Sequence, residues 1–370
     1  MKIVLATGIY PPEIGGPATY ARNLAEKLKE RGGEVTVIAY GSESGIQNSE
    51  NRKWQVVWIS RRGGPIARWN RYAKALQEHA KDADIVYAFS SVSCGIPIVL
   101  ARLKKPKEIL RLGGDFLWER YTDIGGKRSL RSFYMVYPGM KQMMRLLLRR
   151  FHFIVFSTVF QERLCEFLHP RLPPHRVIEN AIPEGRPQLH QKHDPFRLLF
   201  LGRFVRFKNL SSLIRAVSLL PYVHLTLAGD GPARKNIQTL VAKLGLQGRV
   251  KILEIVAGPE KETLLAEHDL LVLPSFTELS PHAAIEARVA GLPVLLTEEM
   301  GLSPALNEGM LIKTLRTSED ITRAVMEAEQ KYGEIAQGAA RPLSQGRPWD
   351  ALVEETMELF RSIVSEQTKC

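Results

Sequence analysis

Cysteine is scarce in this chain of 370 residues, which holds only Cys94, Cys165 and Cys370. Three cysteines far apart in the sequence exclude a disulfide framework and are typical of the reducing cytoplasm. Histidine and cysteine form no group with the spacing of metal ligands, so we predict no bound metal. We also predict no cofactor, since the chain lacks a complete dinucleotide-binding motif. Cys370 is the last residue and is therefore not a prenylation signal, which needs three further residues.

Long hydrophobic runs are also lacking. The longest uncharged stretch, residues 85–101, is interrupted by serine, glycine and proline and is slightly short for a bilayer span. The opening residues, MKIVLATGIYPPE, lack the cleavage pattern of a signal peptide. We therefore expect a cytoplasmic protein without a membrane-spanning segment. A chain of this length is expected to form two domains, each with its own core.

Acidic residues are outnumbered in the first half of the chain. Up to Arg186 there are 30 lysines and arginines and 17 aspartates and glutamates, whereas the remainder has 21 and 22. The first half therefore carries a balance of +13, which favours anionic partners such as phosphates, nucleic acid or anionic lipid. Its basic residues are not arranged in a nucleic-acid recognition motif, so no specific nucleic acid is expected.

Apolar strands alternate with helical patterns along the chain, which is typical of an α/β protein with parallel sheets. Between the halves, residues 180–195 have the proline-rich, polar composition of a linker. We predict Rossmann-like domains over residues 1–185 and 186–345, and a last helix within 346–370. The expected strands are 2–7, 34–40, 55–60, 84–89, 108–112 and 153–157, then 197–202, 224–229, 269–275, 292–297 and 310–314.

The most informative stretch is PSFTELSPHAAIEARVAGLPVLLT, residues 274–297. It predicts a strand end, a polar loop with Glu278, and a helix capped by Ser280 with Pro281 in its first turn. Glu286 falls inside that helix. Because ligands bind outside the carboxyl ends of strands in open α/β sheets, both carboxylates are candidates for binding sugar hydroxyls.

Glycines and cations follow other strands. Gly15 and Gly16 precede a helix opened by Pro17, where backbone N–H groups can approach a phosphate. Arg203 and Lys208 follow the first strand of the second half and could clamp a diphosphate. Ordinary turn glycines and solvated cations are the alternatives. Gly229, in the segment LAGDGP, allows a close backbone approach, but the third glycine of a dinucleotide motif is missing.

Three acidic patterns need separate interpretations. Asp115 follows Gly113 and Gly114 at a strand end, where it is either a residue of the reacting centre or the cap of a turn. Asp82-Ala83-Asp84 spells a metal-binding pattern but precedes its strand, so a structural turn is favoured. His268-Asp269 likewise precedes a strand and indicates no catalytic triad.

Residues 139–153 form an amphipathic pattern. The expected apolar face holds Met140, Met143, Met144, Leu147 and Phe151, with Lys141, Arg145 and Arg149 opposite. A helix that covers the sheet is the favoured interpretation. The alternative is an interfacial helix that touches anionic lipid on the inner face of the cytoplasmic membrane.

Taken together, the chain resembles the retaining glycosyltransferases of family 4, which have the GT-B fold. The resemblance covers nearly the whole length and is specific because its motifs occur in this order. They are YPPEIGGPATYARNLAEKL, GRFVRFKNLSSLIRA, LAGDGP and PSFTELSPHAAIEARVAGLPV. It implies two Rossmann-like domains facing across a cleft, with the last helix packing back onto the first domain.

The resemblance also implies roles for the candidate residues. Arg203 and Lys208 would bind the donor diphosphate, Glu286 the ribose hydroxyls, and Glu278 the transferred sugar. Gly15 and Gly16 would approach the donor phosphate or the acceptor. The reaction would be a metal-independent transfer from a nucleotide-diphosphate sugar to a glycan or lipid-linked acceptor, as in polysaccharide biosynthesis.

Two departures from the family pattern stand out. Leu279-Ser280-Pro281 replaces a glycine-containing loop, and Pro281 has no N–H to donate to a sugar. Asp115 stands where many members carry a histidine. The alternative functions are a sugar-nucleotide epimerase with the same fold and a non-catalytic protein that binds anions or nucleic acid.

Overall fold

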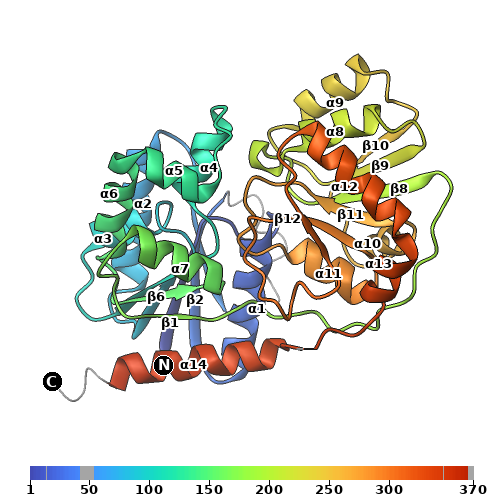
Figure 1. The fold of residues 1–370 in the computed structure, drawn as a ribbon. Helices are drawn as coiled ribbons and strands as arrows, with labels where there is room; N and C mark the ends of the chain where they lie inside the picture. The colour runs from blue at the N-terminus through green and yellow to red at the C-terminus, as the bar shows by residue number, and fades with distance from the viewer. Residues whose placement is uncertain (14, 42–53, 345, 366–370) are drawn as a thin grey trace. The chain divides into compact units, whose positions relative to one another are not determined.

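The computed structural model describes residues 1–13, 15–41, 54–344 and 346–365, and Cys370 lies outside these ranges. The chain splits into two compact units, coloured along the sequence in Figure 1. Unit 1 contains Met1–Leu117, Tyr134–Ala181 and Trp349–Cys370, and unit 2 contains Trp118–Phe133 and Ile182–Pro348. Unit 2 therefore includes a short segment from the first half of the sequence. None of the described helices is long and apolar enough to cross a membrane.

Unit 1 is built on seven parallel strands in the order β3-β2-β1-β4-β5-β6-β7. The strand order reverses between β1 and β4, and such a point is where open α/β sheets bind ligands. Near-continuous apolar runs form these strands because helices bury both faces of a parallel sheet. Their bounds are β1 (Lys2–Thr7), β2 (Glu34–Tyr40), β3 (Gln55–Ile59), β4 (Ile85–Ala88), β5 (Lys107–Leu112), β6 (Phe153–Phe156) and β7 (His175–Val177).

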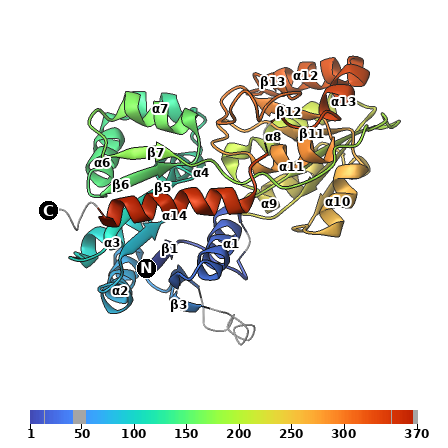
Figure 2. The ribbon, with the colours of Figure 1, turned by 90° about the horizontal axis from the view of Figure 1, so that it is seen from below.

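The helices of this half include one from the far end of the chain. Those of the first half are α1 (Gly16–Glu30), α2 (Pro65–His79), α3 (Gly95–Ala101), α4 (Phe116–Asp123), α5 (Leu130–Val136), α6 (Pro138–Leu148) and α7 (Val159–Leu168). Helix α14 (Trp349–Ser365) lies along unit 1 beside α1 (Figure 2). Its Trp349 ring packs 5.3 Å from that of Tyr20, and Phe360 packs 5.2 Å from Tyr87. Leu352, Met357, Leu359, Phe360 and Ile363 form its buried face.

Helix α6 differs from its predicted form. It ends at Leu148, and only Met144 and Leu148 are buried on it. Met140 and Met143, which we expected on the packed face, are 38% and 45% exposed. Met144 and Phe151 are buried as predicted. The prediction was wrong for Met140 and Met143, because the buried residues of the helix, 144 and 148, are four apart and give a single narrow line of contact.

Unit 2 contains six parallel strands in the order β10-β9-β8-β11-β12-β13. Its strand order reverses between β8 and β11. Helix α8 lies beside α9 and α12, and α10 lies beside α11. The bounds are β8 (Phe196–Leu201), α8 (Leu210–Ser218), β9 (Val223–Ala228), α9 (Arg234–Lys243), β10 (Val250–Leu253), α10 (Pro259–Ala266), β11 (Leu270–Leu273), α11 (His282–Ala290), β12 (Val294–Thr297), β13 (Leu311–Lys313), α12 (Ser318–Gln330) and α13 (Tyr332–Ala339).

All eleven predicted strands are present, with ends within two residues of those expected. Strands β7 and β10 were not predicted. Strand β7 has only three residues, of which two are polar, and β10 interrupts its four-residue apolar run with Lys251. Both are edge strands, which need less apolar surface than central ones.

Candidate functional site

Two of the predicted site residues meet in unit 2. Lys208 Nζ donates to Glu278 Oε1 at 2.5 Å. Lys208 ends the 3₁₀ turn Arg206–Lys208 after β8, and Glu278 lies in the loop after β11. Because β8 and β11 are neighbours where the strand order reverses, their carboxyl ends bring these loops together. The two side chains are 17% and 6% exposed, so the ion pair is largely removed from solvent.

Glu278 is held by several further bonds. Ser275 Oγ also donates to Oε1 at 2.5 Å. The backbone N–H of Glu278 donates to Glu299 O, and its carbonyl accepts from Gly301 N, each at 2.8 Å. The carboxylate is thus fixed in place before any ligand arrives, as a binding site requires. This role of Ser275 was not predicted from the sequence. Its position three residues before Glu278 is the local feature that could have indicated it.

Arg203 lies in the same loop as Lys208. Its side chain is exposed and makes no hydrogen bond or ion pair with another described residue. The loop itself is joined to the one after β9, since Phe204 N donates to Asp230 O at 2.8 Å. A Cβ on Gly229 would lie 1.9 Å from Gly202 O, so packing between these loops already requires glycine there. The predicted approach of Gly229 to a donor stays a prediction.

Glu286 lies inside α11, as predicted, and pairs with a residue that the sequence did not indicate. Lys261 Nζ, on α10, donates to Glu286 Oε1 at 2.8 Å, and both side chains are about a third exposed. The predicted helix start was wrong. Helix α11 begins at His282 with Pro281 in the cap position, so Ser280 lies one residue before the cap. Pro281 takes that place because its carbonyl accepts from Ala284 N and Ile285 N.

In unit 1, Gly15 and Gly16 lie at the start of α1, after β1. The Gly15 carbonyl accepts from Ala18 N at 3.0 Å and from Thr19 N at 3.1 Å. An added Cβ on Gly16 would meet no described atom within 4 Å, and Gly16 is exposed. Packing therefore does not require glycine at position 16. A ligand that approaches the backbone there would require it.

Asp115 lies directly before α4, at the carboxyl end of β5. Tyr134 Oη donates to Asp115 Oδ2 at 2.7 Å. Burial, followed by the nearby Asp115 charge, raises the pKa of Tyr134 well above its ordinary value. Tyr134 therefore stays protonated and can keep donating to the carboxylate. Both interpretations of Asp115, as part of a reacting centre or as a turn residue, fit this place.

The two patterns that we set aside have structural roles. Asp84 accepts from Lys2 N at 2.8 Å and pairs with Lys105 at the entry to β4. Asp269 accepts from the backbone N–H groups of His193 and Arg197. Among the described residues, no group of three or more His, Cys, Asp and Glu could hold a metal ion.

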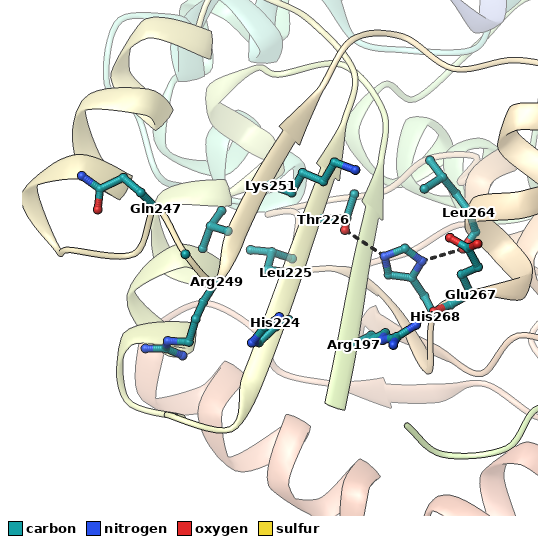
Figure 3. A pocket seen from close by; sticks show the side chains of 12 residues that line it. Arg197, His224, Leu225, Thr226, Gln247, Arg249, Lys251, Leu264, Glu267 and His268 are labelled. Carbon is teal, nitrogen blue, oxygen red and sulfur yellow. Dashed lines mark hydrogen bonds between the residues drawn. The ribbon is translucent and has the colours of Figure 1, made fainter. Parts of the chain in front are cut away.

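An open pocket of about 510 Å³ lies elsewhere in unit 2, over β8, β9 and β10 (Figure 3). Its lining includes Arg197, His224, Thr226, Lys251 and His268. His268 Nδ1 donates to the Leu264 carbonyl at 2.6 Å, and its Nε2 forms a hydrogen bond with Thr226 Oγ1 at 2.8 Å. None of the predicted site residues lines this pocket, so it is distinct from the Lys208–Glu278 pair.

Two family models match the chain in succession. Residues 15–181 match the glycosyl transferase 4-like domain, and residues 181–337 match glycosyl transferases group 1. The chain belongs to the family 4 glycosyltransferases. It is therefore an enzyme of the class that transfers a sugar from a nucleotide-sugar.

Two relatives are also described as glycosyltransferases, and two solved structures share the fold of the chain. An uncharacterised glycosyltransferase of Methanocaldococcus jannaschii is 25% identical over 98% of both chains. The lipopolysaccharide core biosynthesis glycosyltransferase LpsE of Rhizobium meliloti is 33% identical over 40% of this chain and 46% of its own. Sucrose-phosphate synthase from Thermosynechococcus elongatus superposes with a TM-score of 0.80 at 16% identity, covering 99% of each chain. Anabaena HepE, in complex with UDP and glucose, superposes with a TM-score of 0.73 at 19% identity, covering 98% of this chain and 100% of its own. The predicted GT-B fold is confirmed.

Proposed function

We propose that this glycosyltransferase moves a hexose from a nucleotide-diphosphate sugar to a hydroxyl of a glycan or lipid-linked acceptor, with retention of the anomeric configuration. The ion pair between Lys208 and Glu278 carries the proposal. It brings a cation and a carboxylate together at the carboxyl ends of β8 and β11, and we assign the carboxylate to the sugar hydroxyls. The HepE complex with UDP-glucose supports a diphosphate donor, and the LpsE likeness supports a glycan acceptor.

In the proposed reaction, the bond between the anomeric carbon and the diphosphate oxygen breaks, and its electron pair leaves with the diphosphate. Lys208 and Arg203 would stabilise the negative charge that develops there. The acceptor hydroxyl forms the new bond on the face that the diphosphate leaves, and its proton goes to that phosphate. Glu278, held by Ser275, would orient the sugar hydroxyls.

Metal independence is part of the proposal. Two cationic side chains in one loop can supply the charge that a divalent metal would otherwise supply. We expect transfer to persist in excess EDTA and to fall sharply in Arg203→Met, because the exposed Arg203 side chain has no described protein partner to lose. Activity that returns only on addition of Mg²⁺ or Mn²⁺ would contradict this part.

The test begins with thermal shift against UDP-, GDP-, ADP- and TDP-sugars. A donor at a hundred times its dissociation constant should add about 2.7 kcal/mol to the free energy of unfolding. The stabilising donor is then incubated with glycan acceptors, and the anomeric configuration of the product is read by NMR. A product formed from donor alone would indicate an epimerase. Unchanged biological function in Glu278→Gln would indicate a non-catalytic sensor.

For the first unit, Gly16→Ala tests whether a ligand approaches the start of α1. The added methyl group has open space in the fold, so thermal stability should stay within about 0.5 kcal/mol of wild type. We expect kcat/KM to fall about tenfold because the methyl group would occupy space that the ligand needs. Full activity would leave Gly16 as an ordinary turn residue.

We further propose that unit 1 touches anionic membrane through α6 and the end of α5. Met135, Met143 and Leu146 are 63%, 45% and 56% exposed there. Between Tyr134 and Glu162, in unit 1, the sequence has no acidic residue and four lysines or arginines. Exposed apolar side chains beside unopposed basic ones suit an anionic lipid surface.

Vesicle flotation tests the membrane proposal. Wild type should float with vesicles rich in anionic lipid, and Arg149→Glu/Arg150→Glu should not. Lys243→Glu/Lys251→Glu makes the same change of charge on exposed lysines of unit 2 and should still float. Equal loss in both variants would show that net charge alone drives the binding, and no flotation of wild type would overturn the proposal.

A further inference from the structure

The segment Trp118–Phe133 belongs to unit 2 although it lies between two parts of unit 1 in the sequence. It is a folded piece, because Trp118 Nε1 donates to the Arg128 carbonyl at 2.9 Å and closes it into a loop. The Trp118 side chain is 2% exposed. Nothing in the sequence of this segment indicates a role in donor binding.

One end of the segment contacts the residue before Lys208. The Trp118 ring packs on Phe207 with ring centroids 5.1 Å apart and an interplanar angle of 44°. Lys208 Nζ in turn lies 5.3 Å from the centroid of that Phe207 ring. Near the middle of the segment, an added Cβ on Gly125 would lie 3.2 Å from Arg206 Nη1, in the same turn. Displacing Trp118 would therefore leave the Phe207 ring, on which the Lys208 ammonium lies, without its packing partner.

The other end contacts the residue before Glu278. Leu130 N donates to Thr277 Oγ1 at 3.1 Å, and Thr277 is 1% exposed. The loops of Lys208 and Glu278 are also bonded to each other, since Phe276 N donates to Phe207 O at 2.8 Å. The segment thus contacts both loops, each at the residue directly before a member of the ion pair.

We propose that residues 118–133 are a brace that positions Lys208 and Glu278 for the donor. The positioning residues are Trp118, within the brace, and Thr277, which accepts from Leu130 of the brace. The inference rests on the proposed function. Lysine has a flexible four-carbon stem, so its ammonium needs outside support to hold one geometry. A misplacement of about 1 Å at a reacting centre can lower a rate about a hundredfold, so such support affects catalysis.

The main test is a double-mutant cycle between Trp118→Ala and Lys208→Met. The readouts are kcat/KM and the Kd of the nucleoside diphosphate, among UDP, GDP, ADP and TDP, that stabilises wild type most. Trp118→Ala should raise this Kd about tenfold in wild type and less than twofold in the Lys208→Met background. The two effects should not add, because the brace acts through Lys208.

Tyr332→Ala is the matched control. Tyr332 is also a buried aromatic of unit 2 and packs 5.8 Å from Phe196, at the start of β8 and away from the loop of Lys208. It should lower the thermal midpoint as Trp118→Ala does and leave the Kd within twofold. If Trp118→Ala behaves like this control, or weakens binding equally in both backgrounds, the brace is wrong.

The second contact has its own pair of variants. Thr277→Val removes the acceptor of Leu130 N at nearly constant volume, and Thr277→Ser keeps it. We expect kcat/KM to fall about fivefold in the valine variant and less than twofold in the serine variant. Equal rates would overturn the role of Thr277. A wild type that neither binds any of the four nucleotides nor transfers sugar would instead overturn the proposed function, and the brace with it.

Discussion

Among the residues that the structure describes, each unit buries one glutamate, and the two glutamates differ in their partners. Glu278 of unit 2 is 5% exposed, and its carboxylate accepts from Lys208 and Ser275. Glu108 of unit 1 is 8% exposed, and its side chain makes no hydrogen bond or ion pair with another described residue. Burial accordingly raises the pKa of Glu108 to about 7.

The place of each glutamate along its strand explains the difference. Glu278 follows the carboxyl end of β11, where loops from neighbouring strands supply donors. Glu108 is the second residue of β5, near its amino end, where its backbone bonds to His152 but its carboxylate finds no partner. A buried carboxylate supplied with a cation is expected to bind or react, whereas one without a partner only lowers stability.

The largest effect that this comparison predicts is on catalysis. Glu278→Gln should lower kcat/KM by about 10² to 10³, because the charge that orients the sugar and pairs with Lys208 is lost. Steady-state kinetics with the identified donor measure this, and the thermal midpoint should be recorded alongside. The double variant Lys208→Met/Glu278→Gln is the control for the unpaired lysine. Wild-type kinetics in Glu278→Gln would falsify the assignment.

The second effect is on stability and depends on pH. The ordinary pKa of glutamate is 4.5 and that of Glu108 is about 7, so the unfolded chain ionises first as the pH rises. Wild-type stability should therefore decline between these values. Glu108→Gln lacks this loss, so it should equal wild type below pH 4.5 and exceed it by roughly 3 kcal/mol above pH 7.

Urea unfolding at pH 5, 6 and 8 measures the gain from Glu108→Gln. Glu34→Gln is the matched control, because Glu34 starts β2 of the same sheet and its side chain is 67% exposed. Its difference from wild type should not grow with pH. If the difference in unfolding free energy between Glu108→Gln and wild type also stays constant with pH, burial does not raise the pKa of Glu108 in the folded protein.

A third carboxylate, Asp115, tests whether unit 1 follows the same rule. It lies at the carboxyl end of β5, and its carboxylate accepts a hydrogen bond from the hydroxyl of Tyr134. If Asp115 belongs to the reacting centre, Asp115→Asn should lower kcat about tenfold and leave the donor KM within twofold. Tyr134→Phe keeps the charge and should change kcat less than threefold. Equal effects in the two variants would make Asp115 a turn residue.

Much of the fold could be predicted from the sequence because the strands of parallel sheets are continuous apolar runs. Runs such as residues 2–7 and 270–273 are buried on both faces and stand out against amphipathic helices. The short edge strand β7 could not be found in this way, because an edge strand buries little and HRV carries no apolar run. Met140 and Met143 of helix α6 were wrongly predicted to be buried, because which side of a helix meets a sheet depends on the tertiary structure.

The candidate site was predicted only as separate residues. Motif positions indicated Lys208, Glu278 and Glu286, since these follow strands or lie in the helix after one. No local pattern indicates that Lys208 and Glu278 form an ion pair, because they are 70 residues apart in the sequence. Lys261 and Trp118 were missed for the same reason: each contacts the site across a sequence distance that no local pattern spans.

The smallest predicted effect concerns Glu286, whose partner Lys261 offers a way to separate structure from binding. Their side chains are 32% and 29% exposed, so the pair contributes less than about 1 kcal/mol to stability. If Glu286 binds ribose hydroxyls, Glu286→Gln should raise the donor KM about fivefold. Lys261→Met should change it less than threefold, because the carboxylate remains. If the pair only joins α10 to α11, both variants should lower the thermal midpoint alike and leave the donor KM unchanged. Donor KM and thermal midpoint, measured on the same two variants, decide between these roles because only ribose binding requires the charge on Glu286 itself.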